Sequence, residues 1–276
     1  MKEANRDKAG ENYWTNFWKS AEALPPAAMS HGKISGSYVV RQLDELFVRH
    51  LPTEQQSRGK QLLEIGCGNS IWLSYFQQRF GFDVHGLDYS EYGCEQTRKI
   101  LARDGVAGTV HHVDLFKPPV ELLNKFDVVC SFGVVEHFSD TESAIRAAVQ
   151  FLKPGGILIT TIPNLMGPTG LLQKIFYRPV YDIHVVMDKQ RITSALRHCG
   201  LEVTAAEYFC TLSFGVSLEP INQTPVKAAG LKKFALKLFQ ALGKILNLVD
   251  TRIVRLPKTK YTSEGIFTIA LHNRRD

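Results

Sequence analysis

Residues 62–70 read LLEIGCGNS, and an acidic residue, Asp88, follows 20 residues after Gly68. The apolar start predicts a buried strand, the glycines a tight turn, and the residues after them the start of a helix. A second strand, FDVHGLD at 82–88, ends on the acid. Glycines let a backbone approach a ligand closely, and an acid in this position can accept hydrogen bonds from both ribose hydroxyls. The unit therefore predicts a nucleoside site.

The details of the turn separate two kinds of nucleoside ligand. A dinucleotide fingerprint has a third small residue, which allows the helix to pack closely on the strand. Here that position is Ile71, and the acid Glu64 precedes the turn, where it would repel a pyrophosphate. A cationic, phosphate-free nucleoside fits better, and S-adenosylmethionine has a sulfonium, an amino group and no phosphate.

Five segments in order resemble the class I S-adenosylmethionine-dependent methyltransferases. They are ExGxG at 64–68, the acid Asp88, VDL at 113–115, FDVVCSFGVVEHF at 126–138 and LKPGG at 152–156. The resemblance covers about 60–163 and returns near 264–272. It implies an α/β fold, with a seven-stranded, mostly parallel, doubly wound sheet. It carries little information on the methyl acceptor.

Apolar runs and helical periodicity alternate at the spacing of a parallel sheet. We expect strands near 60–66, 83–88, 108–113, 126–131, 156–162, 201–208 and 264–272, and helices near 37–50, 70–80, 90–104, 140–152 and 188–199. We divide the chain into an N-terminal helical lid at 1–50, a cofactor-binding domain at 51–209 and 261–276, and a basic helical cap inserted at 210–260.

The resemblance implies which residues hold the cofactor, S-adenosylmethionine, and its product S-adenosylhomocysteine. The glycine turn should meet the amino-acid portion, Asp88 the ribose, and Asp114 with Leu115 the adenine. The full expected set is Glu64, Gly66, Cys67, Gly68, Asp88, Tyr89, Asp114, Leu115, Ser131 and Phe132.

A hydroxyl acceptor must lose its proton during methyl transfer, so a base is useful. His137 is the first candidate because it follows the fourth strand, where this family places acceptor-facing residues; His184 is the second. The adjacent His111 and His112 point to opposite faces of a strand and cannot form one metal site, so no metal is expected. For the acceptor we expect the aromatic N-terminal helix and the segment after the fifth strand to contribute Tyr13, Trp14, Trp18, Asn164 and Tyr181.

The net charge of +6 is unevenly distributed. Nine basic residues and one acidic residue give 226–260 a charge of +8, so the rest of the chain carries −2. Within it, 227–249 has an apolar stripe at helical spacing: Leu231, Phe234, Ala235, Leu238, Leu242, Ile245 and Val249. We favour a cap helix packed over the substrate mouth or in a homodimer. The alternatives are peripheral membrane contact, with the lysines on anionic headgroups, and a binding site for an anionic acceptor.

The function expected is methylation of a small molecule, most simply O-methylation of a sugar, a natural product or a glycan or lipid precursor. A nucleic-acid methyltransferase acting on RNA is opposed by the sequence CSFG at 130–133, because enzymes acting on base amines show an Asn/Asp-Pro-Pro-aromatic segment there. A non-catalytic partner subunit is opposed by the intact glycines and acids, and an oxidoreductase by Ile71. The polar first eight residues are not a secretory signal, and the five cysteines are scattered, so a cytoplasmic protein is expected.

Overall fold

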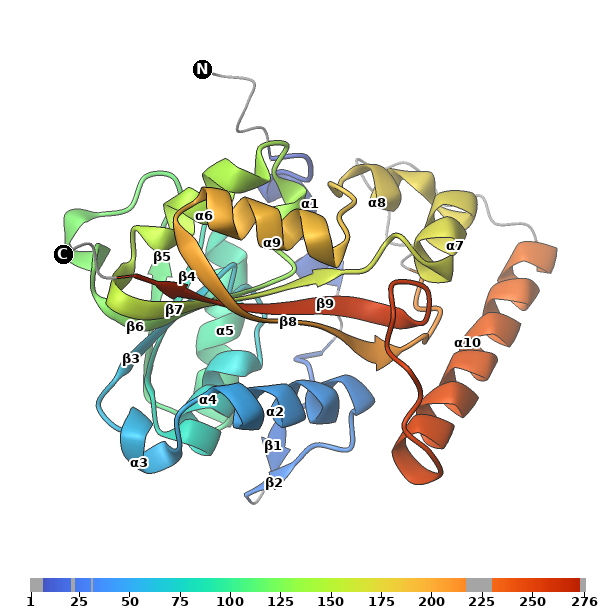
Figure 1. The fold of residues 1–276 in the computed structure, drawn as a ribbon, viewed down its shortest axis with the longest axis horizontal. Helices are drawn as coiled ribbons and strands as arrows, with labels where there is room; N and C mark the ends of the chain where they lie inside the picture. Colours follow the sequence, from blue (N-terminus) through green and yellow to red (C-terminus); the bar gives the residue numbers. More distant parts are fainter. Residues whose placement is uncertain (1–6, 21–22, 31, 217–229, 274–276) are drawn as a thin grey trace.

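The chain folds around one seven-stranded sheet (Figure 1). The computed structural model describes residues 7–20, 23–30, 32–216 and 230–273. The strand order is β5-β4-β3-β6-β7-β9-β8, which confirms the predicted fold class. The strands are β3 Gln61–Ile65, β4 Asp83–Asp88, β5 Gly108–His112, β6 Phe126–Phe132, β7 Leu152–Pro163, β8 Leu201–Thr211 and β9 Ser263–His272.

The sheet is parallel except at one strand. β3 pairs in parallel with β4 and β6, and β6 with β7, whereas β9 lies antiparallel between β7 and β8. β7 begins earlier than the expected 156, because Leu152 already pairs with Phe126 before the register shifts across the Lys-Pro-Gly-Gly turn. The carboxyl ends of β3, β4, β6 and β7 therefore meet at one edge, where ligands of open parallel sheets bind.

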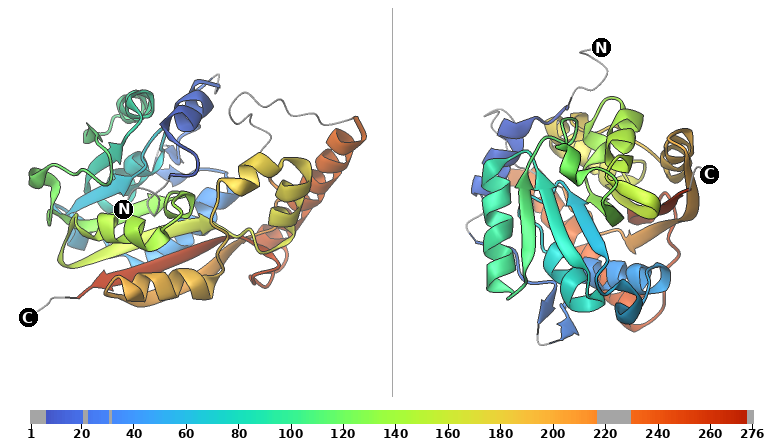
Figure 2. Two further views of the ribbon diagram at one scale, coloured as in Figure 1. Left: turned by 90° about the horizontal axis from the view of Figure 1, so that it is seen from above. Right: turned by 90° about the vertical axis from the view of Figure 1, so that its left-hand side faces the viewer.

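Helices cover both faces of the sheet (Figure 2). Because successive side chains along β3 point to opposite faces of the sheet, Leu62 packs in the hydrophobic cluster on one face and Leu63 in the cluster on the other. Neither side chain is exposed to solvent. Burial on both faces explains why these strands are almost continuously apolar. The principal helices are α2 Tyr38–His50, α4 Trp72–Phe80, α5 Glu91–Arg103, α6 Thr141–Val149 and α9 Lys189–His198, with a short α3 at Glu54–Ser57.

The N-terminal 50 residues serve two structural roles. α1 (Glu11–Ser20) lies over the carboxyl edge of the sheet, and its Tyr13 packs with Tyr177, Val180 and Ile183. α2 instead buries Leu43 and Phe47 in the main core. A two-stranded hairpin of β1 (Met29–Ser30) and β2 (Lys33–Ile34) joins them.

Three short helical segments follow the strands at the carboxyl edge. η2 (Val135–His137) comes directly after β6, while α7 (Pro168–Phe176) and α8 (Arg178–Asp182) follow β7. A further single turn, η1 at Val120–Leu122, precedes β6. The expected acceptor segment after the fifth strand is thus helical.

The basic helix, α10 at Gly230–Arg252, lies at one end of the molecule (Figure 1). Residues 227–229 of the expected helix fall outside the described residues. α10 docks through Leu236, Gly243 and Asp250, spaced seven residues apart. A Cβ on Gly243 would clash with the Ser213 carbonyl oxygen. The buried Asp250 carboxylate accepts hydrogen bonds of 2.7 Å from the Tyr38 hydroxyl and the Leu256 amide.

The apolar stripe of α10 faces solvent instead of packing on the domain as a cap. Phe234, Leu238 and Ile245 are 67%, 64% and 57% exposed, and Leu242 and Leu248 accompany them. The expectation of a cap missed this because apolar periodicity does not distinguish a buried stripe from an exposed one. The face of α10 that docks on the domain is narrow, and it includes Gly243 and the hydrogen-bonded Asp250. In the part of the chain that the structure describes, no helix is long and apolar enough to span a bilayer.

Candidate active site

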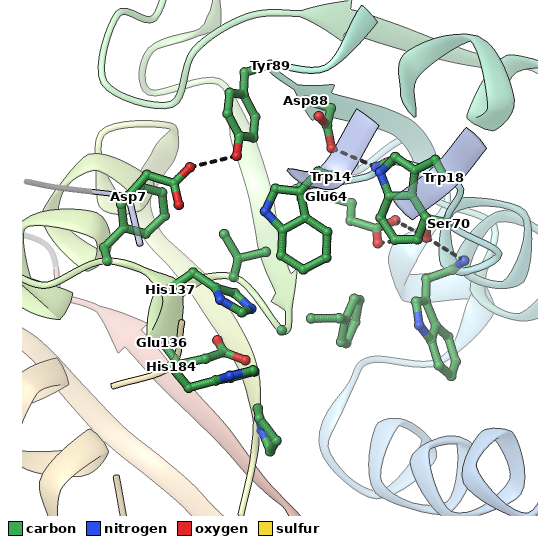
Figure 3. A pocket seen from close by; sticks show the side chains of 18 residues that line it. Asp7, Trp14, Trp18, Glu64, Ser70, Asp88, Tyr89, Glu136, His137 and His184 are labelled. Carbon is green, nitrogen blue, oxygen red and sulfur yellow. Dashed lines mark hydrogen bonds between the residues drawn. The ribbon is translucent and has the colours of Figure 1, made fainter. Parts of the chain in front are cut away.

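A cavity of about 410 Å³ opens at the carboxyl ends of β3, β4 and β6 (Figure 3). Its volume falls in the range of about 300–1,000 Å³ that small-molecule sites occupy. Two acids, Glu64 and Asp88, lie on one side, and Glu136, His137 and His184 lie together on another. Aromatic side chains from α1, α4 and β6 line the space between them: Trp14, Trp18, Trp72 and Phe132.

The glycine turn after β3 requires glycine at both positions. Gly66 has φ +70°, and a Cβ there would lie 2.6 Å from Val134 Cγ2. At Gly68 a Cβ would lie 2.7 Å from Trp18 Nε1 and 2.9 Å from Asp88 Oδ2. Both positions line the cavity, so the turn presents bare backbone to a ligand.

Asp88 joins the turn to the end of β4. Its Oδ2 accepts a hydrogen bond of 2.8 Å from the Gly68 amide, and its Oδ1 accepts one of 2.7 Å from the Ser90 amide. Burial raises the pKa of the carboxyl, while these two amide donors lower it. The carboxylate is therefore held in one orientation at the cavity wall, with further lone pairs available for a ligand.

Glu64 is a buried acid with a single neighbouring hydroxyl. Only 2% exposed, it has Ser70 Oγ at 2.7 and 2.8 Å from its two carboxylate oxygens. Burial raises the pKa of Glu64 to about 8, because the Ser70 hydroxyl alone compensates poorly for the lost water and the nearby Asp88 raises the pKa further. Glu64 is consequently mostly protonated at pH 7, and a cation bound beside it would favour the ionised carboxylate.

The aromatic side of the cavity comes from α1. Trp14 and Trp18 stack with ring centroids 5.7 Å apart, and Trp14 meets His137 edge-on at 5.0 Å. Tyr89 donates a hydrogen bond of 2.7 Å from its hydroxyl to Asp7, just ahead of α1. α1 thus closes one side of the cavity through side chains far in sequence from the sheet.

The two candidate catalytic histidines come together, although 46 residues of chain lie between His137 and His184. Their ring centroids are 4.4 Å apart, and both rings line the cavity. Burial is the main cause that lowers both pKa values, to about 3 for His137. Both imidazoles are therefore neutral at pH 7. Glu136, which was not among the expected site residues, lies beside them.

Several expected site residues lie outside this cavity. Asn164 is buried, and its amide donates to the carbonyls of Lys260 and Ser263 at 2.8 and 2.9 Å. Asp114 accepts from the Phe116 amide at 2.9 Å, with its side chain 43% exposed. The others that do not line it are Tyr13, Cys67, Leu115, Ser131 and Tyr181.

The cavity also includes residues that sequence reasoning did not select. Val134 and Phe138 lie inside the fourth recognised segment, at 126–138, and Trp72 is the first residue of α4, after the glycine turn. The only sequence signal for them was their position at strand ends. Asp7, Ser70, Gly133 and Pro163 complete this group.

Comparisons with known proteins agree with this geometry. Residues 36–206 match the methyltransferase-domain family Methyltransf_23. The chain is 36% identical to a ubiquinone biosynthesis O-methyltransferase of Ruegeria pomeroyi, over 60% of this chain and 69% of that protein. It is 30% identical to a protein of the same name from Pseudomonas aeruginosa, over 52% of this chain and 66% of that protein.

A solved structure shows the same fold at much lower identity. It is phosphoethanolamine N-methyltransferase 2 of Haemonchus contortus in complex with S-adenosyl-L-methionine. The TM-score is 0.56 at 16% identity, covering 98% of this chain and 59% of that one. With a family match over more than half of its length, the chain belongs to the S-adenosylmethionine-dependent methyltransferases.

Proposed function

We propose that this enzyme transfers a methyl group to a hydroxyl on a small, ring-containing molecule. The observation that carries the proposal is the division of one cavity into two sides. Glu64, Asp88 and the glycine turn form a side suited to a cationic nucleoside. The neutral His137 and His184 form a side suited to a hydroxyl, with aromatic rings between them. The similarity to O-methyltransferases supports the hydroxyl acceptor.

S-adenosylmethionine supplies an electrophilic methyl on a sulfonium, and the protein supplies position. We infer that Asp88 accepts hydrogen bonds from the ribose hydroxyls and that Glu64 pairs with the amino group. Trp18 lies against Gly68 beside Asp88, which supports the proposal that α1 acts as a lid. The bare glycine backbone at 66–68 fits the amino-acid portion.

On the acceptor side, the hydroxyl would lie against the imidazoles. His137 and His184 each donate an Nδ1 hydrogen to a backbone carbonyl, so each presents Nε2 as an acceptor. A hydrogen bond from the hydroxyl to Nε2 orients its oxygen toward the methyl. Trp14, Trp72 and Phe132 favour a flat ring as the body of the acceptor.

We further propose that the exposed face of α10 contacts an anionic membrane surface. Phe234, Leu238, Leu242 and Ile245 recur at helical spacing on the face away from the domain. Lys237 and Lys244 are exposed beside them. An apolar stripe bordered by lysines is the pattern of an interfacial helix.

Removing the Asp88 carboxylate should weaken cofactor binding. In Asp88→Ala we expect the affinity for S-adenosylhomocysteine to fall by about 2–4 kcal/mol, because two charge-assisted hydrogen bonds are lost. Isothermal titration calorimetry measures this, with circular dichroism to check folding. Asp83→Ala, at the exposed opposite end of the same strand, is the matched control. Equal affinity in folded Asp88→Ala would contradict the ribose assignment.

Cofactor binding should release a proton from Glu64. Its pKa of about 8 keeps the carboxyl protonated at pH 7, whereas pairing with an ammonium requires the carboxylate. Affinity should therefore rise by up to about tenfold per pH unit between pH 6 and 8 and level off above. Calorimetry in buffers of different ionisation enthalpy counts the protons released. Glu64→Gln should abolish both the proton release and the pH dependence of cofactor affinity. If the affinity of this variant still depended on pH, Glu64 would be excluded as the source of the released proton.

Removing the imidazole of His137 should slow methyl transfer without weakening cofactor binding. We expect His137→Ala to lower turnover by about 10²–10⁴-fold, in the range for loss of a group that handles the transferred proton. Transfer of radiolabelled methyl to catechol, a small dihydroxylated aromatic, provides the assay. His198→Ala, on the exposed surface of α9, is the control. A loss below tenfold would move the role to His184.

The α10 proposal predicts binding to vesicles containing phosphatidylglycerol at low salt and release at high salt. Each lysine near an anionic surface contributes about 1 kcal/mol, and salt screens it. Leu238→Asp with Ile245→Asp should abolish co-sedimentation, whereas Val120→Asp, an exposed apolar residue elsewhere, should not. A dimer that buries α10 would instead double the mass in light scattering and leave the vesicles unbound.

A further inference from the structure

Three side chains of metal-ligating type converge on one wall of the cavity. Glu136 and His137 lie in η2 after β6, and His184 follows α8 (Figure 3). One ligand atom from each lies within 4.8 Å of the other two. The backbone holds the two segments together, because the Val185 amide donates to the Glu136 carbonyl at 2.6 Å. The convergence is therefore part of the fold.

Both histidines are oriented as metal ligands usually are. His137 Nδ1 donates to the Ile183 carbonyl at 3.0 Å, and His184 Nδ1 donates to the Val180 carbonyl at 2.7 Å. Since a carbonyl only accepts, each Nδ1 must hold the hydrogen, and each Nε2 keeps its lone pair. Metal-bound histidines commonly make this second hydrogen bond, which sets the tautomer and the ring angle. The lowered pKa values keep both rings neutral, as coordination requires.

Glu136 lacks the hydrogen bonds that a buried carboxyl group needs. The residue is 1% exposed, and neither Oε1 nor Oε2 has a hydrogen-bond partner within the described residues. Burial raises its pKa to about 8. Buried polar groups are almost always satisfied, and an unsatisfied one points to a missing ion or water. A cation between Glu136 and the two Nε2 atoms would satisfy all three groups together.

We propose that Glu136, His137 and His184 bind a divalent transition-metal cation, which holds and acidifies the acceptor hydroxyl. Two imidazoles and one carboxylate favour Zn²⁺, Fe²⁺ or Co²⁺ over Mg²⁺ or Ca²⁺, which take mainly oxygen ligands. Ligands about 2.1 Å from a tetrahedral metal lie about 3.4 Å apart. Side-chain shifts of about 1 Å would therefore close the site, and the cavity leaves coordination positions for the acceptor.

The chemical role of the cation rests on the proposed function. A bound divalent cation lowers the pKa of a coordinated hydroxyl, as it does for water, so the proton leaves to solvent when the acceptor binds. The oxygen then forms its bond to the methyl carbon while the sulfur–carbon bond breaks. The electron pair stays on sulfur, which gives neutral S-adenosylhomocysteine and the methyl ether.

Cobalt(II) is the probe for the site because its visible absorption reports coordination geometry. Full-length protein stripped with chelator should bind one equivalent of Co²⁺, and Zn²⁺ should displace it. Glu136→Gln and His184→Ala should each weaken binding at least tenfold. His111→Ala is the control, since it disrupts the other close histidine pair, in which His85 Nδ1 lies 3.2 Å from His111 Nε2. Adding catechol should shift the Co²⁺ spectrum if a hydroxyl oxygen enters the coordination sphere.

Calorimetry with S-adenosylhomocysteine on the same samples separates this proposal from the proposed function. If the cofactor binds but Co²⁺ affinity is unchanged in both cluster variants, the metal site is refuted while the methyltransferase assignment stands. A loss of Co²⁺ affinity in His111→Ala, but in neither cluster variant, would also refute the metal site. A catechol methylation rate that is the same in metal-free and metal-loaded protein would overturn the acidification role. If the wild-type protein did not bind S-adenosylhomocysteine, that result would instead count against the proposed function.

Discussion

The backbone junction between the first two central strands is the constraint on which the cavity depends. The amides of Gly66 and Cys67 both donate to the Leu87 carbonyl, at 2.7 and 3.1 Å, and the next amide, Gly68, donates to the Asp88 carboxylate. Three consecutive donors therefore clamp the turn after β3 to the end of β4. The left-handed conformation at Gly66 makes this path possible. This hydrogen-bonded turn fixes the position of Asp88. It also leaves the cavity open beside the turn and sets where α1 packs.

Three buried carboxyl groups line the cavity, and burying them is electrostatically unfavourable. Glu64, Asp88 and Glu136 are buried carboxyl groups whose pKa values burial raises. Asp88 has two amide donors and Glu64 has one hydroxyl, whereas Glu136 has no donor among the described residues. A core built only for stability would replace such groups with apolar ones. Their grouping around one cavity supports the proposal that the cavity binds positively charged ligands.

The sheet could be predicted from the sequence because each strand has a local signal. Runs such as LLEI at 62–65 and a glycine turn predict a strand and its end from neighbours alone. Trp14 and Trp18 could also be predicted as site residues, since helical spacing puts them on one face of a helix. The Glu136, His137 and His184 cluster was not, because its convergence depends on how the chain after β7 folds back. Asn164 is a different case: a polar residue after a strand end suggested a ligand contact, and in the structure its buried amide donates to the carbonyls of Lys260 and Ser263.

The place of β9 has a consequence for how the protein is made. This strand, Ser263–His272, inserts between β7 and β8, which end 100 and 52 residues before it begins. Until it arrives, β7 and β8 each present an open edge of backbone donors and acceptors, and such edges attract wrong partners. The sheet therefore cannot close during most of synthesis on the ribosome, and contacts of this separation form slowly. Nascent chains of this enzyme should rely on chaperones mainly during the interval between the emergence of β8 and that of β9.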